Sequence, residues 1–227
     1  MVVLSSDLHF GHKLCAIHRG FFNDLININQ LTEGKIFLTE NDRMDYLTDV
    51  IKAEIDSGNI SKDIVDERIT KMNEEIVEKW NSKVSNSDEV YLLGDIGFKA
   101  RAEEIEEYVN CLNGKTLTLI KGNHDDRGIV SSKVWDRVYD IYNLHHNHMM
   151  FVLCHYPLAT WNRAQYGTIN LHGHCHNTYP ISNIQMDVGV DSNNLYPYYV
   201  EECLTKMADA PKYNLPDFHG RLHLKTN

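Results

Sequence analysis

Five short apolar runs, each followed at once by polar residues, constrain the fold of this 227-residue chain most strongly. The runs are "MVVLSSD", "EVYLLGD", "LTLIKGNHD", "MMFVLCHYP" and "TINLHGHCH". Each is typical of a buried β-strand whose carboxyl end carries polar side chains. Between them, residues 62–84 and 101–113 place apolar side chains at helical spacing, and Gly114 is a suitable cap for the second helix. Strands that alternate with helices predict an α/β core.

Residues 22–60 interrupt this alternation and are expected to form an insertion on the core. The stretch "LININQLTEGKIFLTE" indicates two short strands around a turn, and "DRMDYLTDVIKAEIDSG" indicates a helix that ends at Gly58. Residues 210–227 contain two prolines and predict an irregular tail. We therefore expect a single domain over residues 1–227 with an inserted hairpin and helix.

Charge and composition narrow the class of protein. With 42% hydrophobic residues, a chain of this length can bury a substantial core. Its 22 basic and 32 acidic residues give a net charge of −10, which argues against a basic face that grips duplex nucleic acid. A small anionic substrate remains compatible with this charge if bound cations reverse its sign locally.

The cysteines and the apolar runs bear on the compartment. Five cysteines are an odd number, and no two of them have Cys-x-x-Cys spacing, so neither a disulfide framework nor a zinc knuckle is indicated. The first ten residues lack the basic start of a secretory leader, and no run reaches the roughly 18 apolar residues of a membrane span. We expect a cytoplasmic protein without membrane association.

Residues with metal-binding side chains follow the five apolar runs. Because ligands bind at the carboxyl ends of strands in α/β sheets, residues from all five segments are expected to converge there. Taken singly, each is more simply explained as a strand-end cap or turn residue. Taken together, they predict a metal site. They are Asp7 and His9, Asp95, the group Asn123, His124 and Asp125, then His155, and finally His174 and His176.

The order Asp-x-His, Gly-Asp, Gly-Asn-His-Asp, His, Gly-His-x-His closely resembles the calcineurin-like metallophosphoesterase family. The stretches "MNEEIVEKWNSKV" and "MDVGVD" are similar to those of its compact bacterial and phage members. The resemblance implies a β-sandwich core flanked by helices in the layer order αββα. It also implies a phosphohydrolase that cleaves monoesters or diesters, with a small nucleotide-type phosphate ester as the expected substrate.

The resemblance also assigns the ligands of two metal ions. One ion is implied on Asp7, His9, Asp95 and His176, and the second on Asp95, Asn123, His155 and His174, so that Asp95 bridges. Mixed carboxylate and imidazole ligands suit borderline divalent ions, which a shared carboxylate holds about 3.5–4 Å apart. We expect manganese, with iron, zinc, nickel or magnesium as alternatives, and a bridging hydroxide as the nucleophile. His124 is the expected general acid, oriented by Asp125.

Other residues near these segments have less definite roles. Arg127 and Arg163 would either grip the substrate phosphate or lie exposed. His12 would either face the site from a loop or make a structural hydrogen bond. Strand alternation is expected to turn His172 and Cys175 away from the metals. His145, His146 and His148 in "LHHNHMM" are expected in a solvated hairpin turn.

Two further functional classes stay open. One is a nuclease acting on single-stranded or structured nucleic acid, and the other is a catalytically inactive relative that serves as a binding scaffold. Met44, Leu47, Val50, Ile51 and Ile55 form an apolar stripe in the insertion, which must be buried against the core or against a second copy of the chain. The insertion is accordingly expected to act as a lid or as the interface of a homo-oligomer, the alternative being a peripheral decoration with no influence on the substrate.

Overall fold

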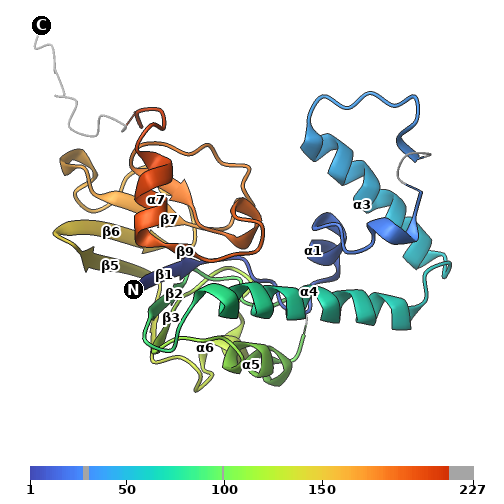
Figure 1. The fold of residues 1–227 in the computed structure, drawn as a ribbon, viewed down its shortest axis with the longest axis horizontal. Coiled ribbons are helices and arrows are strands. Elements are labelled where there is room, and N and C mark those ends of the chain that lie inside the picture. Colours follow the sequence, from blue (N-terminus) through green and yellow to red (C-terminus); the bar gives the residue numbers. More distant parts are fainter. Residues whose placement is uncertain (28–30, 99, 215–227) are drawn as a thin grey trace, which may run out of the picture.

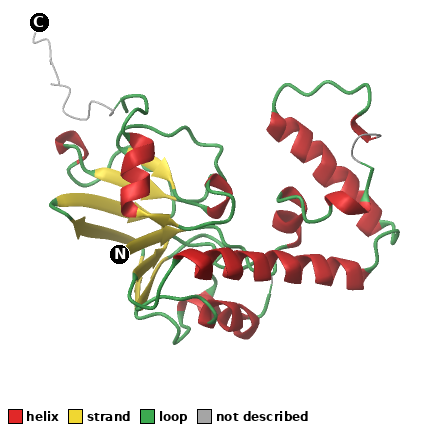
Figure 2. Cartoon of the chain, viewed as in Figure 1, coloured by secondary structure: helices red, strands yellow, loops and turns green. Residues whose placement is uncertain are grey.

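The computed structural model describes residues 1–27, 31–98 and 100–214. Two mixed sheets lie face to face and are flanked by helices (Figures 1 and 2). The strands of the first sheet, in spatial order, are β4 (Arg137–Tyr139), β3 (Thr116–Ile120), β2 (Glu89–Leu92), β1 (Val2–Ser5) and β9 (Tyr198–Tyr199). Those of the second are β5 (Ile141–His146), β6 (Met149–Cys154), β7 (Ile169–His172) and β8 (Gln185–Asp187). The α/β class is confirmed.

All five apolar runs of the sequence form strands. β1 to β4 are mutually parallel, as are β6, β7 and β8, so that polar residues after these strands gather at one edge of each sheet. β9 and β5 are the antiparallel strands. An isolated parallel bridge between Ser6 and Gly189 joins the segments that follow β1 and β8.

Side-chain alternation in β1 explains why the first sheet is covered on both faces. Val2 and Leu4 belong to the core between the two sheets, whereas Val3 belongs to the core between the first sheet and the helices. Period-2 alternation with both sides apolar is the pattern of a strand in a central layer. Trp80 packs in the helix-side core and is fully buried.

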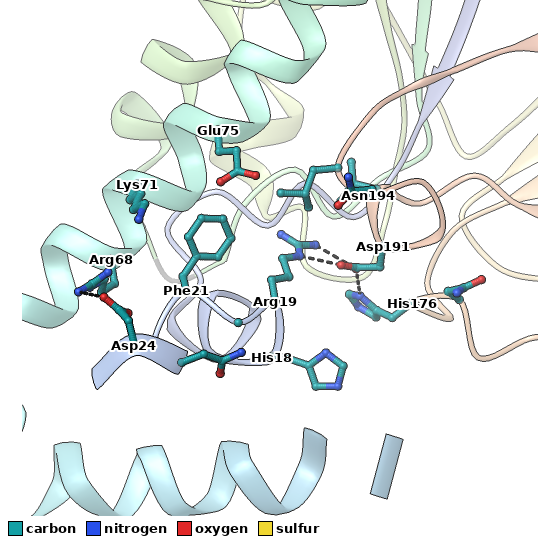
Figure 3. A pocket seen from close by; sticks show the side chains of 15 residues that line it. His18, Arg19, Phe21, Asp24, Arg68, Lys71, Glu75, His176, Asp191 and Asn194 are labelled. Carbon is teal, nitrogen blue, oxygen red and sulfur yellow. Dashed lines mark hydrogen bonds and ion pairs between the residues drawn. The ribbon is translucent and has the colours of Figure 1, made fainter. Parts of the chain in front are cut away.

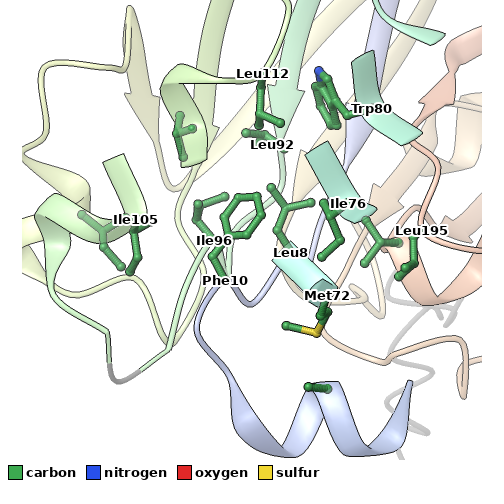
Figure 4. Packing of buried hydrophobic residues seen from close by; sticks show 14 of the residues in the cluster. Leu8, Phe10, Met72, Ile76, Trp80, Leu92, Ile96, Ile105, Leu112 and Leu195 are labelled. Atoms are coloured by element: carbon green, nitrogen blue, oxygen red, sulfur yellow. The ribbon is translucent and has the colours of Figure 1, made fainter. Parts of the chain in front are cut away.

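Six α-helices have described bounds: α1 (Lys13–His18), α3 (Glu40–Asp56), α4 (Lys62–Lys83), α5 (Ala102–Asn110), α6 (Arg127–Val130) and α7 (Val200–Met207). α4 presents Met72, Ile76 and Trp80 to the first sheet, where Figure 4 shows them beside Leu8 and Leu92. The predicted helix over residues 62–84 is confirmed. The one predicted over 101–113 is shorter, because it is capped at Cys111, so the assignment of Gly114 as its cap is wrong.

The second sheet is covered differently from the first. Val152 on its outer face packs against Trp161 and Ala164 of the loop that follows β6. α7 packs into the core between the sheets through Val200, Cys203 and Met207. In the loop that follows β6, the described residues form only a short 3-10 helix, Ala164–Tyr166. Helices therefore cover the first sheet, whereas a loop packs on the outer face of the second sheet, where the expected αββα order has helices.

The insertion holds a helix, but its described part contains no hairpin. α3 begins at the Thr39 cap, which exchanges hydrogen bonds with Asp42, and ends before Gly58, whose φ is +82°. Residues 31–39 form a helical turn and a loop instead of a strand, and residues 28–30 of the predicted hairpin lie outside the described residues. The hairpin was predicted because apolar residues lie on both sides of Thr-Glu-Gly-Lys. These residues do not alternate with polar ones as they would in a half-buried strand.

The predicted apolar stripe of the insertion packs within the chain. Leu47 and Ile51 are buried, and Ile55 packs against the helix-side core. α3 contacts α1, and Figure 1 shows it standing apart from the two sheets. These three residues are therefore covered without a second copy of the chain, whereas Met44 and Val50 of the same stripe are only half-buried.

The remaining predictions concern a turn, the C-terminal residues and membrane association. Asn147 and His148 have φ of 49° and 64° and join β5 to β6, so a hairpin turn lies here as predicted. His145 and His146, which were expected in that turn, are instead the last residues of β5. Residues 210–214 have no helix or strand, as predicted for the tail, and 215–227 lie outside the described residues. None of the described helices is both long and apolar enough to cross a membrane.

Candidate metal centre

The backbone at the edge where the strands end is unusual. The predicted ligands Asp7, His9, Asp95, His174 and His176 all have positive φ, between 45° and 70°. Such values are uncommon for residues other than glycine, and strain of this kind gathers at functional sites. Backbone bonds hold two of these turns together, because the amide of Asp7 donates to Gly94 and that of His9 donates to Asp95, each at 3.0 Å.

Two glycines allow the loops to approach these carboxylates. A Cβ atom at Gly122 would overlap Oδ1 of Asp95, and one at Gly173 would overlap Ser6 and crowd Oδ2 of Asp7. The Gly-Asn-His-Asp and Gly-His-x-His segments therefore need glycine for close packing. A side chain at Gly122 would push its segment away from Asp95, and one at Gly173 would push its segment away from Asp7.

Asp7, His9 and His176 form the first group that could hold a metal ion, with ligand atoms within 4.8 Å of one another. Nε2 of His9 lies 3.8 Å from Oδ1 of Asp7, and Nε2 of His176 lies 3.9 Å from the same oxygen. That oxygen and both ring nitrogens of His9 are buried without a hydrogen-bond partner. Unpaired buried polar atoms are costly, so this set fits a cation that would bind them together.

Burial is the main cause of the pKa shifts of Asp7 and His9 in this group. It raises the pKa of Asp7 to about 6, opposed by the positive charge of His176. It lowers the pKa of His9 to about 2, and the nearby Arg19 adds to that effect. Both shifts disfavour the charged form of the side chain. His9 is accordingly neutral near pH 7, which is the form that coordinates a metal.

Asp95, His155 and His174 form the second group, again within 4.8 Å. Oδ2 of Asp95 lies 3.5 Å from Nε2 of His155 and 3.8 Å from Nε2 of His9, so it faces both groups. Its Oδ1 accepts a hydrogen bond from the amide of His124 at 2.9 Å. Burial alone would raise the pKa of Asp95, but the contact with His155 and the amide bond lower it to about 2.

Asn123 meets the second group through His155. Nδ1 of His155 donates to the carbonyl of Leu93 at 2.7 Å, which leaves Nε2 with the lone pair in the neutral ring. Nε2 is 3.0 Å from Oδ1 of Asn123, so two acceptors face each other and share a cation or a proton. Although burial would lower the pKa of His155, its contacts with Asp95 and Leu93 raise it, as expected when a proton takes that place.

A partly buried ion-pair network, which was not predicted from the sequence, supports His176 (Figure 3). Nδ1 of His176 lies 2.6 Å from Oδ2 of Asp191, and Arg19 binds both oxygens of Asp191, at 2.7 and 3.0 Å. Arg19 also donates to the carbonyl of Asp7 at 2.7 Å. Such a carboxylate fixes the tautomer of a ligating histidine. The available signal was "MDVGVD", which ends in Asp191.

His124 lies at this site, but Asp125 does not orient it as predicted. The His124 side chain is 37% exposed, and its Nε2 lies 4.0 Å from Oδ2 of Asp95. Asp125 accepts instead from the amides of Gly122, Asp95 and Ile96, at 2.8 to 3.0 Å. With both oxygens occupied, Asp125 ties the Asn123 loop to the Asp95 loop, and burial raises its pKa in spite of these bonds.

The three predicted substrate-binding residues lie in different places. His12 is 2.9 Å from Sγ of Cys15 and its ring lies 5.0 Å from that of His9. Arg127 begins α6 and is exposed. Arg163 is exposed in the loop over the second sheet, with its guanidinium above Tyr166. No described contact joins either arginine to the metal-binding groups.

The remaining histidines and Cys175 belong to none of the groups of described residues that could hold a metal. His172 is buried and its Nδ1 contacts the carbonyl of Gly173. Cys175 lies in a turn rather than in a strand, so the alternation argument used for it was wrong. In the β5–β6 hairpin, His146 is not merely solvated, because it contacts Glu201 at 2.9 Å.

Two cavities adjoin His176. One, of about 670 Å³, lies between the middle of α4 and the loop around Asn194, with Lys71, Arg68 and Asp191 on its walls (Figure 3). The other, of about 290 Å³, is lined by Cys15 and by Asp45 and Thr48 of α3. Residues of the insertion thus line space next to a candidate metal ligand.

The two proteins described below are similar to this chain, and neither has an assigned function. No family model matches the chain. Over 137 residues the chain is 30% identical to the uncharacterized protein MJ1445 of Methanocaldococcus jannaschii, and this region covers 57% of the chain and 71% of that protein. Among solved structures, the protein of unknown function AQ665 from Aquifex aeolicus is similar, with a TM-score of 0.52 and 18% identity, covering 91% of this chain and 99% of that one. This second likeness concerns the fold alone.

Proposed function

The chain belongs to the same family as the uncharacterized archaeal protein MJ1445, and we propose that it is a metal-dependent phosphohydrolase of the calcineurin-like type. The observation that carries the proposal is the meeting of two His/Asp groups at Asp95, whose Oδ2 faces both His9 and His155. The unpartnered buried atoms of Asp7 and His9 add to it. The order of the motifs along the sequence supports the same reading.

Each proposed ion has a distinct set of side chains. Asp7, His9, Asp95 and His176 would hold the first, and Asp95, Asn123, His155 and His174 the second. When bound, such a pair stabilises charge on phosphoryl oxygens and lowers the pKa of a coordinated water. Manganese suits this mixture of carboxylate, amide and imidazole donors.

The residues around the ions have separate tasks in this proposal. Asp191 and Arg19 hold the His176 ring in place through its Nδ1, and the carbonyl of Leu93 does so for His155. His124 is the exposed imidazole beside Asp95, and it would give a proton to the oxygen that leaves phosphorus. Its ring packs edge-on against Phe98 at 4.6 Å, which limits its rotation.

The larger cavity supports a small substrate with a polar group beyond the reacting phosphate. Its acidic residues are already paired: Asp191 with Arg19, Asp24 with Arg68, and Glu75 with Lys79. Lys71 has no ion-pair partner among the described residues, which leaves the cavity one unpaired cation. A nucleotide-type ester, with a second anionic group near Lys71, fits this arrangement better than a long nucleic acid does.

A metal-reconstitution assay tests the proposed function. Chelated protein is reloaded separately with Mn²⁺, Mg²⁺, Zn²⁺ or Ni²⁺ and assayed on a phosphomonoester and a phosphodiester that share one leaving group. We expect no hydrolysis without metal, recovery with Mn²⁺, and a ratio of the two rates that identifies the ester class. Metal binding without turnover of either ester would contradict the proposal and favour a binding scaffold.

A further inference from the structure

A third cluster of metal-binding side chains lies beside His9, on the side of α1. Sγ of Cys15 is 2.9 Å from Nδ1 of His12, and the ligand atoms of Cys15, His12 and His9 all lie within 4.8 Å of one another. His12 is the N-terminal cap of α1 and Cys15 lies in its first turn. One helical turn therefore brings the imidazole and the thiol together.

His9 belongs to this cluster and also to the first metal group. Both of its ring nitrogens are buried and have no hydrogen-bond partner. A neutral imidazole offers only one lone pair to a metal. His9 can therefore complete the group with Asp7 and His176 or the group with His12 and Cys15, but as a neutral ring it cannot serve both.

The two groups differ in the metals that they favour. The first contains a carboxylate oxygen, which suits harder ions such as Mn²⁺ and Mg²⁺. The cluster around Cys15 contains a sulfur, which favours softer ions such as Zn²⁺ and Cd²⁺. Cys15 also lines the cavity of about 290 Å³ that adjoins His176, so an ion has a route from solvent to the sulfur.

We propose that Cys15, His12 and His9 form a binding site for a soft divalent cation, and that its occupation withdraws His9 from the group with Asp7 and His176. Binding forms a metal–sulfur bond and releases the thiol proton to solvent, with no change of oxidation state. The site would make metal loading of the chain sensitive to the ratio of soft to hard divalent ions. The soft-cation site itself does not depend on the proposed function, whereas the competition for His9 rests on metal binding by the group with Asp7 and His176.

Cobalt substitution tests the sulfur ligand directly. A Co²⁺–thiolate bond gives a charge-transfer band in the near ultraviolet, so we expect this band when metal-free protein is saturated with Co²⁺. Cys15→Ser should abolish the band. Cys175→Ser is the matched control, because Cys175 lies between His174 and His176 yet outside the cluster, and it should retain the band. No band in the wild-type protein, or a band lost only in Cys175→Ser, would overturn the proposal.

A displacement experiment tests the sharing of His9. Adding Cd²⁺ to Mn²⁺-loaded protein should release Mn²⁺, measured as the free-ion signal by electron paramagnetic resonance, in proportion to the Cd²⁺ added. Cys15→Ser and Cys15→Ala, with folding checked by circular dichroism, should release far less. Cd²⁺ bound through Cys15 without release of Mn²⁺ would show that the two groups do not compete, which would overturn the second half of the proposal.

Discussion

At the scale of single residues, Asp7 lies in an environment that is unfavourable for an isolated carboxylate. Its carboxyl is buried, one oxygen has no hydrogen-bond partner, and its backbone φ is 58°. The other oxygen accepts from the amide of His174 at 2.9 Å, so the side chain cannot turn away. The strain and the unpaired oxygen are explained together if Asp7 binds a cation.

The raised pKa of Asp7 gives a pH dependence with a definite sign. Because its pKa rises from 3.8 to about 6 on folding, its contribution to the stability of the metal-free protein is fully present below pH 3.8 and is lost as the pH rises through about 6. Each unit of such a shift corresponds to about 1.4 kcal/mol. Urea unfolding with a chelator present should therefore show Asp7→Asn gaining stability relative to wild type as the pH rises through this range.

His9 acts in the opposite sense, because its lowered pKa makes the protein less stable as the pH falls. That contribution is present in both proteins and largely cancels in the comparison. A difference between wild type and Asp7→Asn that does not change with pH would contradict the assigned shift.

His124 is predicted to supply a proton without holding a metal. His124→Ala should keep the metal content and slow turnover by roughly 10²–10⁴-fold on esters with an alkoxide leaving group. The loss should shrink with a nitrophenolate, which barely needs protonation. His146→Ala is the control, since His146 contacts Glu201 far along the chain and belongs to no metal group. Equal losses of rate on both leaving groups would contradict the role of general acid.

At the scale of elements, α3 is attached through a small number of buried side chains. Leu47 and Ile51 are fully buried, and α3 packs chiefly on α1, which carries Cys15 in its first turn and Arg19 as its C-terminal cap. Leu47→Ala should lower the free energy of unfolding by about 2–5 kcal/mol. Met44→Ala, at a half-buried position of the same stripe, should cost less. Chemical denaturation of both variants measures this, and equal costs would indicate that α3 does not dock as described.

α4 brings Lys71 to the larger cavity beside His176. For an ester with a second anionic group, Lys71→Ala should lower kcat/KM about tenfold, which corresponds to about 1.4 kcal/mol. A small artificial ester with no second charge should be hydrolysed at the wild-type rate. Lys62→Ala at the first turn of α4, outside the cavity, serves as the control. The same loss on both esters would place Lys71 outside substrate recognition.

At the scale of the whole molecule, the strands and the candidate metal ligands could be predicted because both depend on local residue patterns. The runs that became β1, β2, β3, β6 and β7 alternate or are uniformly apolar, and each ends at a polar residue. The order of these polar residues along the chain was enough to expect that they meet, and the structure brings Asp7, His9 and His176 together as one group and Asp95, His155 and His174 as another.

What the sequence could not predict depends on contacts between distant residues. Arg19 and Asp191 are 172 positions apart, and neither has a motif of its own that would pair them. The donors to Asp125 were assigned wrongly because three backbone amides bind its carboxylate, and backbone geometry cannot be read from a pattern of side chains. Residues 31–39 contain apolar side chains, yet Ile36 and Leu38 are each 93% exposed, so an apolar run alone did not make a strand.

The central claim is that one carboxylate, that of Asp95, joins two metal-binding groups, and a count of bound metal tests it most directly. Equilibrium dialysis against Mn²⁺ followed by elemental analysis should give about two ions for each wild-type chain and His146→Ala chain. Asp95→Asn should lose affinity for both ions, because a neutral amide replaces the charged carboxylate that faces both groups. Two ions bound by Asp95→Asn with unchanged affinity, or none bound by the wild-type chain, would contradict the account.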